Sequence, residues 1–212
     1  MVYKHYLFES ALGGSAVITE VIGGERPFVR LNQTWFHPQG GGQKADRGTI
    51  AGKAVVNVTH DDGEINHYLL DTDGLYVGQE VLIIVDAEWR DANARLHTGG
   101  HLIAALAEEA FPTLRASGGH HWPGEARVEF TGDDLPDPNE VLRVLGSKLD
   151  QAVTDDLPVQ VLFEDASRSI KIGGHAPVPC GGTHAVSTGR LNGIALTKVK
   201  VKGGKLRVSY QV

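Results

Sequence analysis

The sequence contains one cysteine, Cys180, among its 212 residues. A single cysteine excludes a disulfide framework within the chain and is typical of a protein that works in a reducing compartment. Long apolar runs are missing too, because none approaches the roughly 18 residues that a membrane-spanning helix needs. Residues 1–14 also lack the apolar core of a signal peptide. We therefore expect a cytoplasmic protein with no membrane partner.

Acidic side chains are absent from residues 166–212, a stretch of 47 residues that carries eight Lys and Arg side chains. The whole chain has a formal net charge of −6, and residues 1–90 hold twelve acids and seven bases. A basic segment in an acidic protein can bind an anionic partner such as nucleic acid. The alternative is a solvated strand face, and composition leaves both explanations open.

Residues 1–90 predict a small antiparallel β-barrel. The chain is long enough for one large domain or two small ones. Its first part alternates short β-type runs with turns such as GG, DDG and DTDG, and strands this short at this spacing are typical of such barrels. We expect strands at residues 15–22, 34–38, 48–60, 64–70 and 80–86.

Residues 91–212 predict an α+β domain, so the fold class is a two-domain chain with its boundary near residue 90. Leu96, Leu102, Ile103 and Leu106 fall on one face of a helix expected at residues 86–110. We interpret residues 111–119 only as the end of that helix. A second amphipathic helix is expected at 137–158, and mostly antiparallel strands at 126–130, 159–165, 168–174, 193–201 and 205–212.

Two pairs of residues have metal-ligand spacing. His97 and His101 are four residues apart and share one face of the first helix. Cys180 and His184 form a second pair in the glycine-rich stretch PCGGTH. Neither pair is specific alone, since the chain has ten histidines and the HExxH glutamate is missing. Together they offer three nitrogens and one sulfur, a tetrahedral set of ligands for zinc. One alternative is a buried cysteine with incidental histidines. A less favoured alternative is that Cys180 is a nucleophile.

Glycines beside these motifs indicate close approach of other groups. HTGGH places Gly99 and Gly100 inside a helix, where each costs roughly 1 kcal/mol, so we expect a bulky neighbour there. In FHPQGGGQKADRG, residues 36–48, a glycine run ends in Gln43. Such a loop lets backbone N–H groups approach a substrate or anion, although a plain hairpin turn is the alternative. The loop lacks the Lys-Ser/Thr of a P-loop, which argues against nucleoside triphosphate binding.

HTGGHLIAAL, PCGGTH and FHPQGGGQKADRG together resemble the AlaX family of alanyl-tRNA editing proteins, which are relatives of the editing domain of alanyl-tRNA synthetase. CGGTH is the most specific of the three, and their order also matches. The resemblance covers almost the whole chain and is to the medium-length form, without a long C-terminal oligomerisation extension. Gly99 departs from the alanine more common in the family, and after TG this chain has Arg190, Leu191, Asn192 and Gly193 where the family often has Glu-Ile-Gly.

The resemblance implies a barrel like domain II of translation factors and a zinc-binding α+β editing domain. It implies ATP-independent hydrolysis of the ester that joins serine, and possibly glycine, to tRNA for alanine. The implied cofactor is Zn²⁺, and the expected oligomeric state is a monomer or weak dimer. The implied metal ligands are His97, His101, Cys180 and His184, and Gly41, Gly42, Gln43 and Thr183 are implied to border the editing pocket.

The basic segment is expected to contact the tRNA acceptor stem. Lys198, Lys200 and Lys202 alternate with Val199 and Val201, so a strand would present the lysines to phosphates and the valines to the core. Arg190 is a further expected tRNA contact.

Two mechanisms and two rival functions remain open. Zinc could activate water, or it could organise the pocket and bind substrate; four available protein ligands favour the second, since a catalytic zinc usually keeps one position open. One rival function is a zinc-stabilised RNA-binding module without catalysis, which the presence of Gln43 beside the four ligands disfavours. The other is deacylation of a different mischarged tRNA, such as Ser-tRNA for threonine, which CGGTH disfavours.

Overall fold

A computed structural model describes residues 1–165 and 167–212. Ala166, the first residue of the acid-free segment, lies outside the described residues. The described residues divide by their contacts into two compact units: unit 1 is residues 1–40 and 44–90, and unit 2 is residues 41–43 and 91–212. Each unit has its own hydrophobic core. Gly41–Gln43, expected in the first domain, group by their contacts with unit 2.

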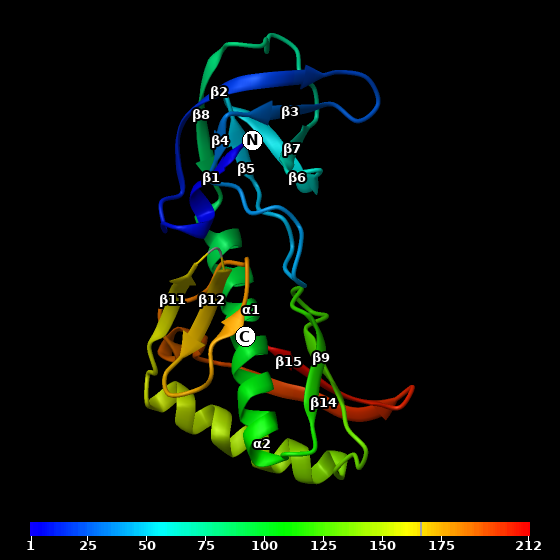
Figure 1. Ribbon diagram of the computed structural model, residues 1–212. Coiled ribbons are helices and arrows are strands. Elements are labelled where there is room, and N and C mark those ends of the chain that lie inside the picture. Colours follow the sequence, from blue (N-terminus) through cyan, green and yellow to red (C-terminus); the bar gives the residue numbers. More distant parts are fainter. Residues whose placement is uncertain (166) are drawn as a thin grey trace. The chain divides into compact units, whose positions relative to one another are not determined.

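Unit 1 is an antiparallel β-barrel (Figure 1). Alternate residues face its core, as in β8 (Glu80–Val85), where Val81, Ile83 and Val85 are buried and the residues between them are exposed. The remaining barrel strands are β2 (Gly13–Ile22), β3 (Phe28–Leu31), β7 (Glu64–Leu69), β6 (Lys53–Asp61) and β5 (Gly48–Ile50), in that order round the barrel. Two short parallel strands, β1 (Tyr3–Lys4) and β4 (Gln33–Thr34), and the 3-10 helix η1 (His5–Leu7) complete the described elements of this unit.

The strand expected at residues 34–38 is wrong beyond Thr34, where β4 ends. Trp35, Phe36 and His37 are all buried one after another. A half-buried strand would turn every second side chain to solvent, so this stretch leaves the strand pattern and packs into the barrel core instead.

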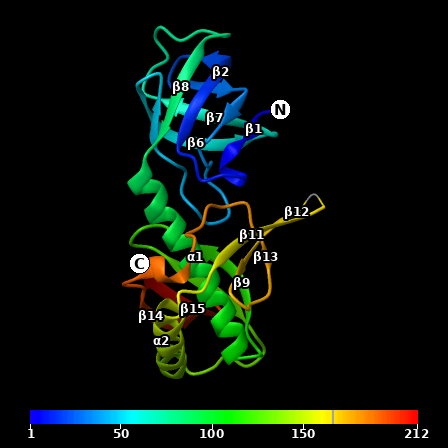
Figure 2. The same cartoon turned by 90° about the vertical axis from the view of Figure 1, so that its left-hand side faces the viewer.

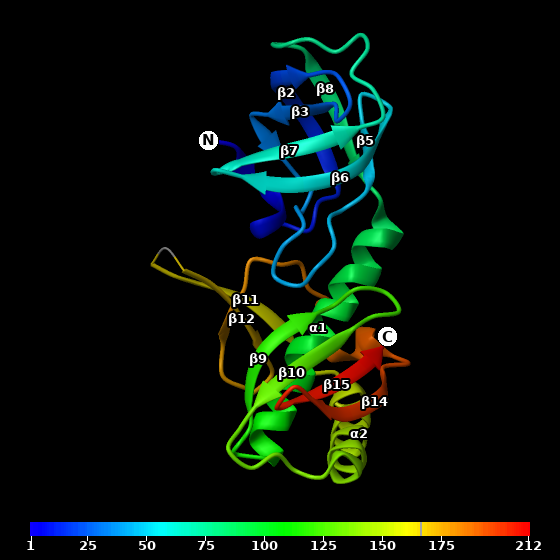
Figure 3. The same cartoon turned by 90° about the vertical axis from the view of Figure 1, so that its right-hand side faces the viewer.

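The main sheet of unit 2 is antiparallel and is covered by helices on one face (Figure 3). The helices are α1 (Ala87–Ala110), which continues from unit 1, and α2 (Pro138–Thr154). None of the described helices is both long and apolar enough to cross a membrane. The strand order is β14 (Ala195–Lys202), β15 (Lys205–Gln211), β10 (Arg127–Thr131) and β9 (Arg115–His120).

A second sheet lies on the other side of α1 from β9 (Figure 1). Its first two strands form a hairpin that extends away from α1 (Figure 2). A 3-10 helix, η2 (Thr188–Leu191), follows this sheet in the chain. The strands are β11 (Val159–Glu164), β12 (Ser167–Ile172) and β13 (Val178–Pro179).

Helix α2 shows why the second half folds as the periodicity predicts. Asp137 caps the helix by accepting hydrogen bonds from the backbone N–H groups of Asn139 and Glu140, at 2.8 and 3.2 Å. Its apolar positions recur every three to four residues, which places them on one buried stripe against the sheet. The buried residues of this stripe are Val141, Leu145, Leu149 and Ala152.

Candidate metal centre and its pocket

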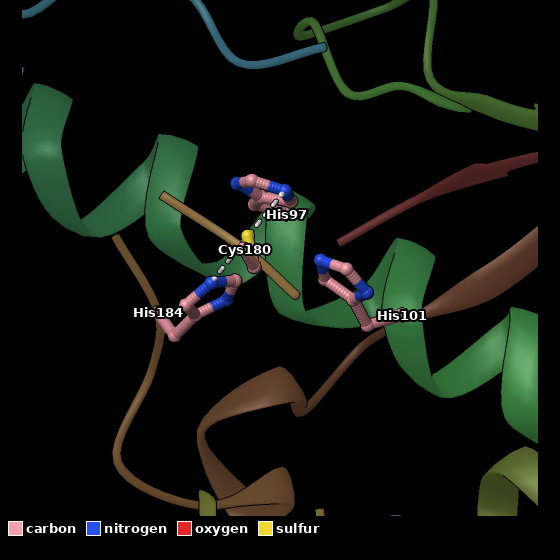
Figure 4. Close-up of side chains that lie close together, drawn as sticks. All are labelled: His97, His101, Cys180 and His184. Carbon is pink, nitrogen blue, oxygen red and sulfur yellow. Dashed lines mark hydrogen bonds between the residues drawn. The ribbon is translucent and has the colours of Figure 1, made fainter. Parts of the chain in front are cut away.

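Four side chains from two distant parts of the sequence form a compact cluster in unit 2 (Figure 4). Helix α1 supplies His97 and His101, one turn apart, and the segment after β13 supplies Cys180 and His184. Their ligand atoms all lie within 4.8 Å of one another. Cys180 Sγ lies 3.2 Å from His184 Nε2 and 3.6 Å from His97 Nε2. A tetrahedral zinc separates sulfur and nitrogen ligands by about 3.5 Å, so these distances suit a shared cation.

Hydrogen bonds turn two of the imidazoles so that Nε2 faces the sulfur. His97 Nδ1 donates to the amide oxygen of Gln43, at 2.8 Å. The Thr98 hydroxyl donates to the carbonyl oxygen of Ala94, so it can only accept at its 3.4 Å contact with His184 Nδ1. Partners of this kind fix the tautomer and the ring direction of metal-binding histidines.

The protonation chemistry of the cluster also fits a thiophilic divalent cation. The buried Nε2 of His101 has no hydrogen-bond partner within the described part of the chain. Burial lowers the pKa of His101 to about 4, which keeps its imidazole in the neutral, ligating form. Burial raises the pKa of the Cys180 thiol, so a thiolate here needs a nearby positive charge. A bound metal ion supplies that charge.

The glycine motif and CGGTH meet at this cluster. Gln43 is fully buried: its amide oxygen accepts the Thr183 backbone N–H at 3.0 Å, and its amide nitrogen donates to the Thr183 hydroxyl at 2.8 Å. Gly41 and Gly42 have φ angles of +55° and +77°, in the left-handed region that favours glycine. A Cβ at Gly182 would lie 2.2 Å from His97 Cε1. Gln43 therefore connects a candidate metal ligand to Thr183.

His121 and Tyr210 belong to the same neighbourhood, although sequence reasoning did not single them out. The His121 ring stacks on His97 with its centroid 4.8 Å away. Its Nδ1 lies 2.6 Å from the Tyr210 hydroxyl oxygen, which donates to the carbonyl oxygen of Leu96 at 2.8 Å. Burial, and to a smaller extent the charges of His101 and His120, lowers the pKa of His121 to about 3.

The helix glycines of HTGGH accommodate the protein's own side chains. A Cβ at Gly100 would lie 2.2 Å from His121 Cε1, and one at Gly99 would lie 3.0 Å from Ile194 Cδ1. The bulky neighbours expected at these glycines are therefore His121 and Ile194. The glycines were the one sequence signal that pointed toward His121.

A pocket of about 660 Å³ opens beside the cluster within unit 2. His101 and His121 both line it, so one wall is shared with the candidate metal centre. Part of the remaining lining is apolar or small, including Ala104 and Val178, and charged side chains line it as well: Arg115, Glu108 and Glu109. The volume lies within the range of small-ligand sites.

The basic residues of β14 lie on one face of the sheet. Lys200 pairs in register with Arg207, and Lys198 and Lys202 flank it on the same face. The pKa of Lys200 is lowered, chiefly by the nearby positive charge of Lys198. Desolvation and the charges of Lys202 and Arg207 add to this effect. Glu129 on β10 is an acidic neighbour, 2.9 Å from Arg207 Nε.

One detail of this basic segment, the burial of Val201, differs from the expectation. Val199 packs against the core, but Val201 is 49% exposed because it lies at the hairpin end of the strand, beside the turn at Gly203. Arg190 lies on η2, away from β14 in the chain, and forms a 3.1 Å ion pair with Asp91.

No family model matches the chain. It is 31% identical over 186 residues to the alanyl-tRNA editing protein AlaX-M of Pyrococcus horikoshii, covering 85% of this chain and 84% of that protein. It is 30% identical to AlaX-L of the same organism over 77% of this chain, and 32% identical to the alanine–tRNA ligase of Corynebacterium glutamicum over 87%. The chain spans 46% of that AlaX-L and 24% of that ligase.

The barrel unit, the α/β unit and the His/Cys cluster define a protein of mixed β and α/β architecture with a candidate metal centre. Because it shares 31% identity over most of its length and most of AlaX-M, the chain belongs to the family of alanyl-tRNA editing proteins.

Proposed function

We propose that this chain is a trans-editing hydrolase, which cleaves the ester between a wrongly attached serine or glycine and tRNA for alanine. The observation that carries the proposal is the meeting of three motifs: the His/Cys cluster, Gln43 and Thr183 lie within hydrogen-bond reach of one another. Family membership supports the same conclusion, since AlaX-M and AlaX-L are named alanyl-tRNA editing proteins. The ester is already activated, so the reaction needs no ATP.

The proposed cofactor is Zn²⁺, held by His97, His101, Cys180 and His184. Zinc favours a tetrahedral set of nitrogen and sulfur ligands, which this cluster offers. When bound, it would polarise the substrate carbonyl or its attacking water. The chain's own contribution is orientation: Gln43 holds His97, and Thr98 holds His184, with Nε2 toward the sulfur.

Gln43 and Thr183 support selection against alanine. The Thr183 hydroxyl accepts from Gln43, which leaves its hydrogen available for a polar group of the substrate. A pocket that pairs with the serine hydroxyl has an unpaired polar group when alanine enters. An unpaired buried group costs roughly 1–3 kcal/mol, so alanine is bound and hydrolysed less well.

The proposed partner is the acceptor stem and 3′ end of tRNA for alanine. Lys198, Lys200 and Lys202 would contact phosphates, and Arg190 would make a separate backbone contact from η2. Units 1 and 2 would be the two domains expected from the sequence, a barrel like translation-factor domain II and the editing domain. We expect the protein to act in the cytoplasm, as a monomer or weak dimer.

The test is hydrolysis of four purified substrates: serine, glycine and alanine on tRNA for alanine, and serine on tRNA for threonine. We expect the first two to be deacylated and the last two to survive. Cys180→Ala should abolish hydrolysis together with metal binding. Absence of hydrolysis by the metal-loaded protein would favour a non-catalytic RNA-binding module, and preferred cleavage of Ser-tRNA for threonine would assign a different editing reaction.

A further inference from the structure

The hydrogen bonds around His121 decide which ring nitrogen carries the proton in the neutral imidazole. Tyr210 Oη donates its single hydrogen to the Leu96 carbonyl oxygen. Its 2.6 Å contact with His121 Nδ1 must therefore be one that it accepts, which places the hydrogen on Nδ1. Nε2 is left with a lone pair and is a hydrogen-bond acceptor.

Among the residues that the structure describes, His121 Nε2 has no hydrogen-bond partner. Gly119 keeps the space beside it open, because a Cβ there would lie 2.4 Å from Nε2. Stacking on His97 and the close approach of Gly100 hold the ring in place. The chain thus positions an acceptor and leaves it unused.

The position of this acceptor indicates what it would bind. His121 lines the pocket of about 660 Å³ that His101 joins to the metal cluster. An aminoacyl ester whose carbonyl lies near that cluster carries hydrogen-bond donors close by: the α-ammonium nitrogen, two bonds from the carbonyl carbon, and, in serine, the hydroxyl oxygen, three bonds from it. A fixed acceptor that faces the pocket beside the metal cluster complements such a donor, and Glu108 and Glu109 are further acceptors in the lining.

We infer that His121 is a substrate-binding residue whose Nε2 accepts a hydrogen bond from the amino acid of the aminoacyl ester. The inference rests on the proposed function and names a contact within the same site. The competing explanation is that His121 only packs against His97 and supports it as a metal ligand. The two explanations differ in what removal of Nε2 changes: substrate binding in the first, metal binding in the second.

The experiment compares His121→Phe with the parent protein. Phenylalanine keeps a flat ring against His97 but removes Nε2, and it also removes the Nδ1 hydrogen bond to Tyr210. We expect kcat/KM for Ser-tRNA to fall about 10- to 100-fold, and the Kd for a non-hydrolysable 3′-seryl-amido-adenosine to rise by a similar factor. Zinc content and the unfolding midpoint should stay near parental values. Loss with serine alone assigns the contact to the hydroxyl, and equal loss with glycine assigns it to the ammonium group.

A matched control is His120→Phe, which changes the neighbouring histidine, whose ring contacts Trp122. Its kcat/KM should stay within about twofold of the parent. A second test variant, Gly119→Ala, retains the imidazole but places a methyl group 2.4 Å from Nε2, which must move the ring out of its acceptor position, so it should weaken analogue binding while the metal stays bound. This variant decides the matter if His121→Phe does not fold.

Parental analogue binding by His121→Phe, or by Gly119→Ala if the first variant does not fold, would overturn the inference. So would a loss of activity that follows a loss of zinc, because that result assigns His121 to support of His97. If the parent binds the analogue but hydrolyses no aminoacyl-tRNA, the proposed function fails while the binding comparison still tests His121.

Discussion

Gly182 lies so close to His97 and Gln43 that there is no room for a side chain at this position of the candidate metal centre. A Cβ at this position would lie 2.2 Å from His97 Cε1 and 2.9 Å from the Gln43 amide oxygen. Gly182→Ala must therefore displace His97, its partner Gln43 or the loop. Disturbing a partner of a metal-binding histidine typically weakens metal affinity 10- to 100-fold, and we expect a loss of that size in a competition assay with a zinc-sensing dye.

Gly181→Ala is the matched control for this prediction. In the part of the chain that the structure describes, no heavy atom outside its neighbours lies within 4 Å of a Cβ at Gly181, so zinc affinity should stay near the parental value. Equal affinities for the two alanine variants would show that His97 does not hold the metal in the way proposed.

His67 makes the stability of unit 1 depend on pH. It is buried, Nδ1 donates to the Val29 carbonyl oxygen, and Nε2 lies 2.8 Å from the Thr34 hydroxyl. Burial lowers its pKa from 6.5 to about 4, although the bond to Val29 opposes this shift. Between these values the unfolded chain binds more protons than the folded one, so the free energy of unfolding falls as pH falls. The full effect is on the order of 3 kcal/mol.

His67→Gln tests this dependence, because glutamine can hydrogen-bond but does not titrate. We expect the variant to be less stable than the parent at pH 7 and to lose less stability between pH 7 and pH 4.5. The measurement is denaturant unfolding of unit 1 at both pH values. An equal loss of stability in the two proteins would contradict the assigned cause.

At the scale of elements, the alternation of residues along strand β14 places its lysine side chains on one face of the sheet. Lys198 and Lys202 are exposed on one face of the strand. Replacing both with glutamine should weaken tRNA binding and reduce the salt dependence of log K by about 0.7–0.9 per lost phosphate contact. Because these lysines are proposed to contact the stem and not the aminoacyl group, hydrolysis of a short aminoacyl-adenosine should hardly change.

Arg143→Gln with Lys148→Gln on α2 is the matched control, since it removes the same charge from another exposed element. Both double variants should be compared across a range of salt concentrations. If they weaken binding equally, net charge alone explains the effect and β14 has no specific role.

Elements with strong periodicity could be predicted, and those without it could not. Helices α1 and α2 lie where their apolar stripes indicated, because a buried stripe repeats in the sequence itself. The sequence of residues 111–119 predicts only the end of a helix, but most of strand β9 lies there. Its sequence, RASGGH, has no alternation because its residues are mostly exposed, and it forms a strand through pairing with β10. Pairing of this kind is a tertiary effect that a local pattern does not contain.

The same distinction applies to the candidate site. The four clustered residues could be proposed because each pair has a regular spacing around a reactive residue type. His121, Tyr210 and Thr98 could not, because their roles come from contacts across 86 to 114 positions of sequence. Gly100 hinted at a close neighbour but could not say which side chain it was.

At the scale of the whole molecule, the chain combines a barrel unit with an α/β unit, and its relatives include proteins named alanyl-tRNA editing proteins and others named alanine–tRNA ligases. It covers most of AlaX-M but about a quarter of the ligase. The basic face of β14, proposed above to contact tRNA, is a local positive surface that can attract an anionic partner to an acidic chain.

The most direct measurement is hydrolysis of Ser-tRNA for alanine as a function of bound zinc. The protein is stripped with a chelator, zinc is returned in known amounts, and deacylation and metal content are measured on the same samples. We expect activity to disappear on stripping and to return in proportion to zinc up to one ion per chain, while Ala-tRNA survives throughout. Full activity in the stripped protein, or equal cleavage of Ala-tRNA and Ser-tRNA, would contradict a zinc-dependent editing site.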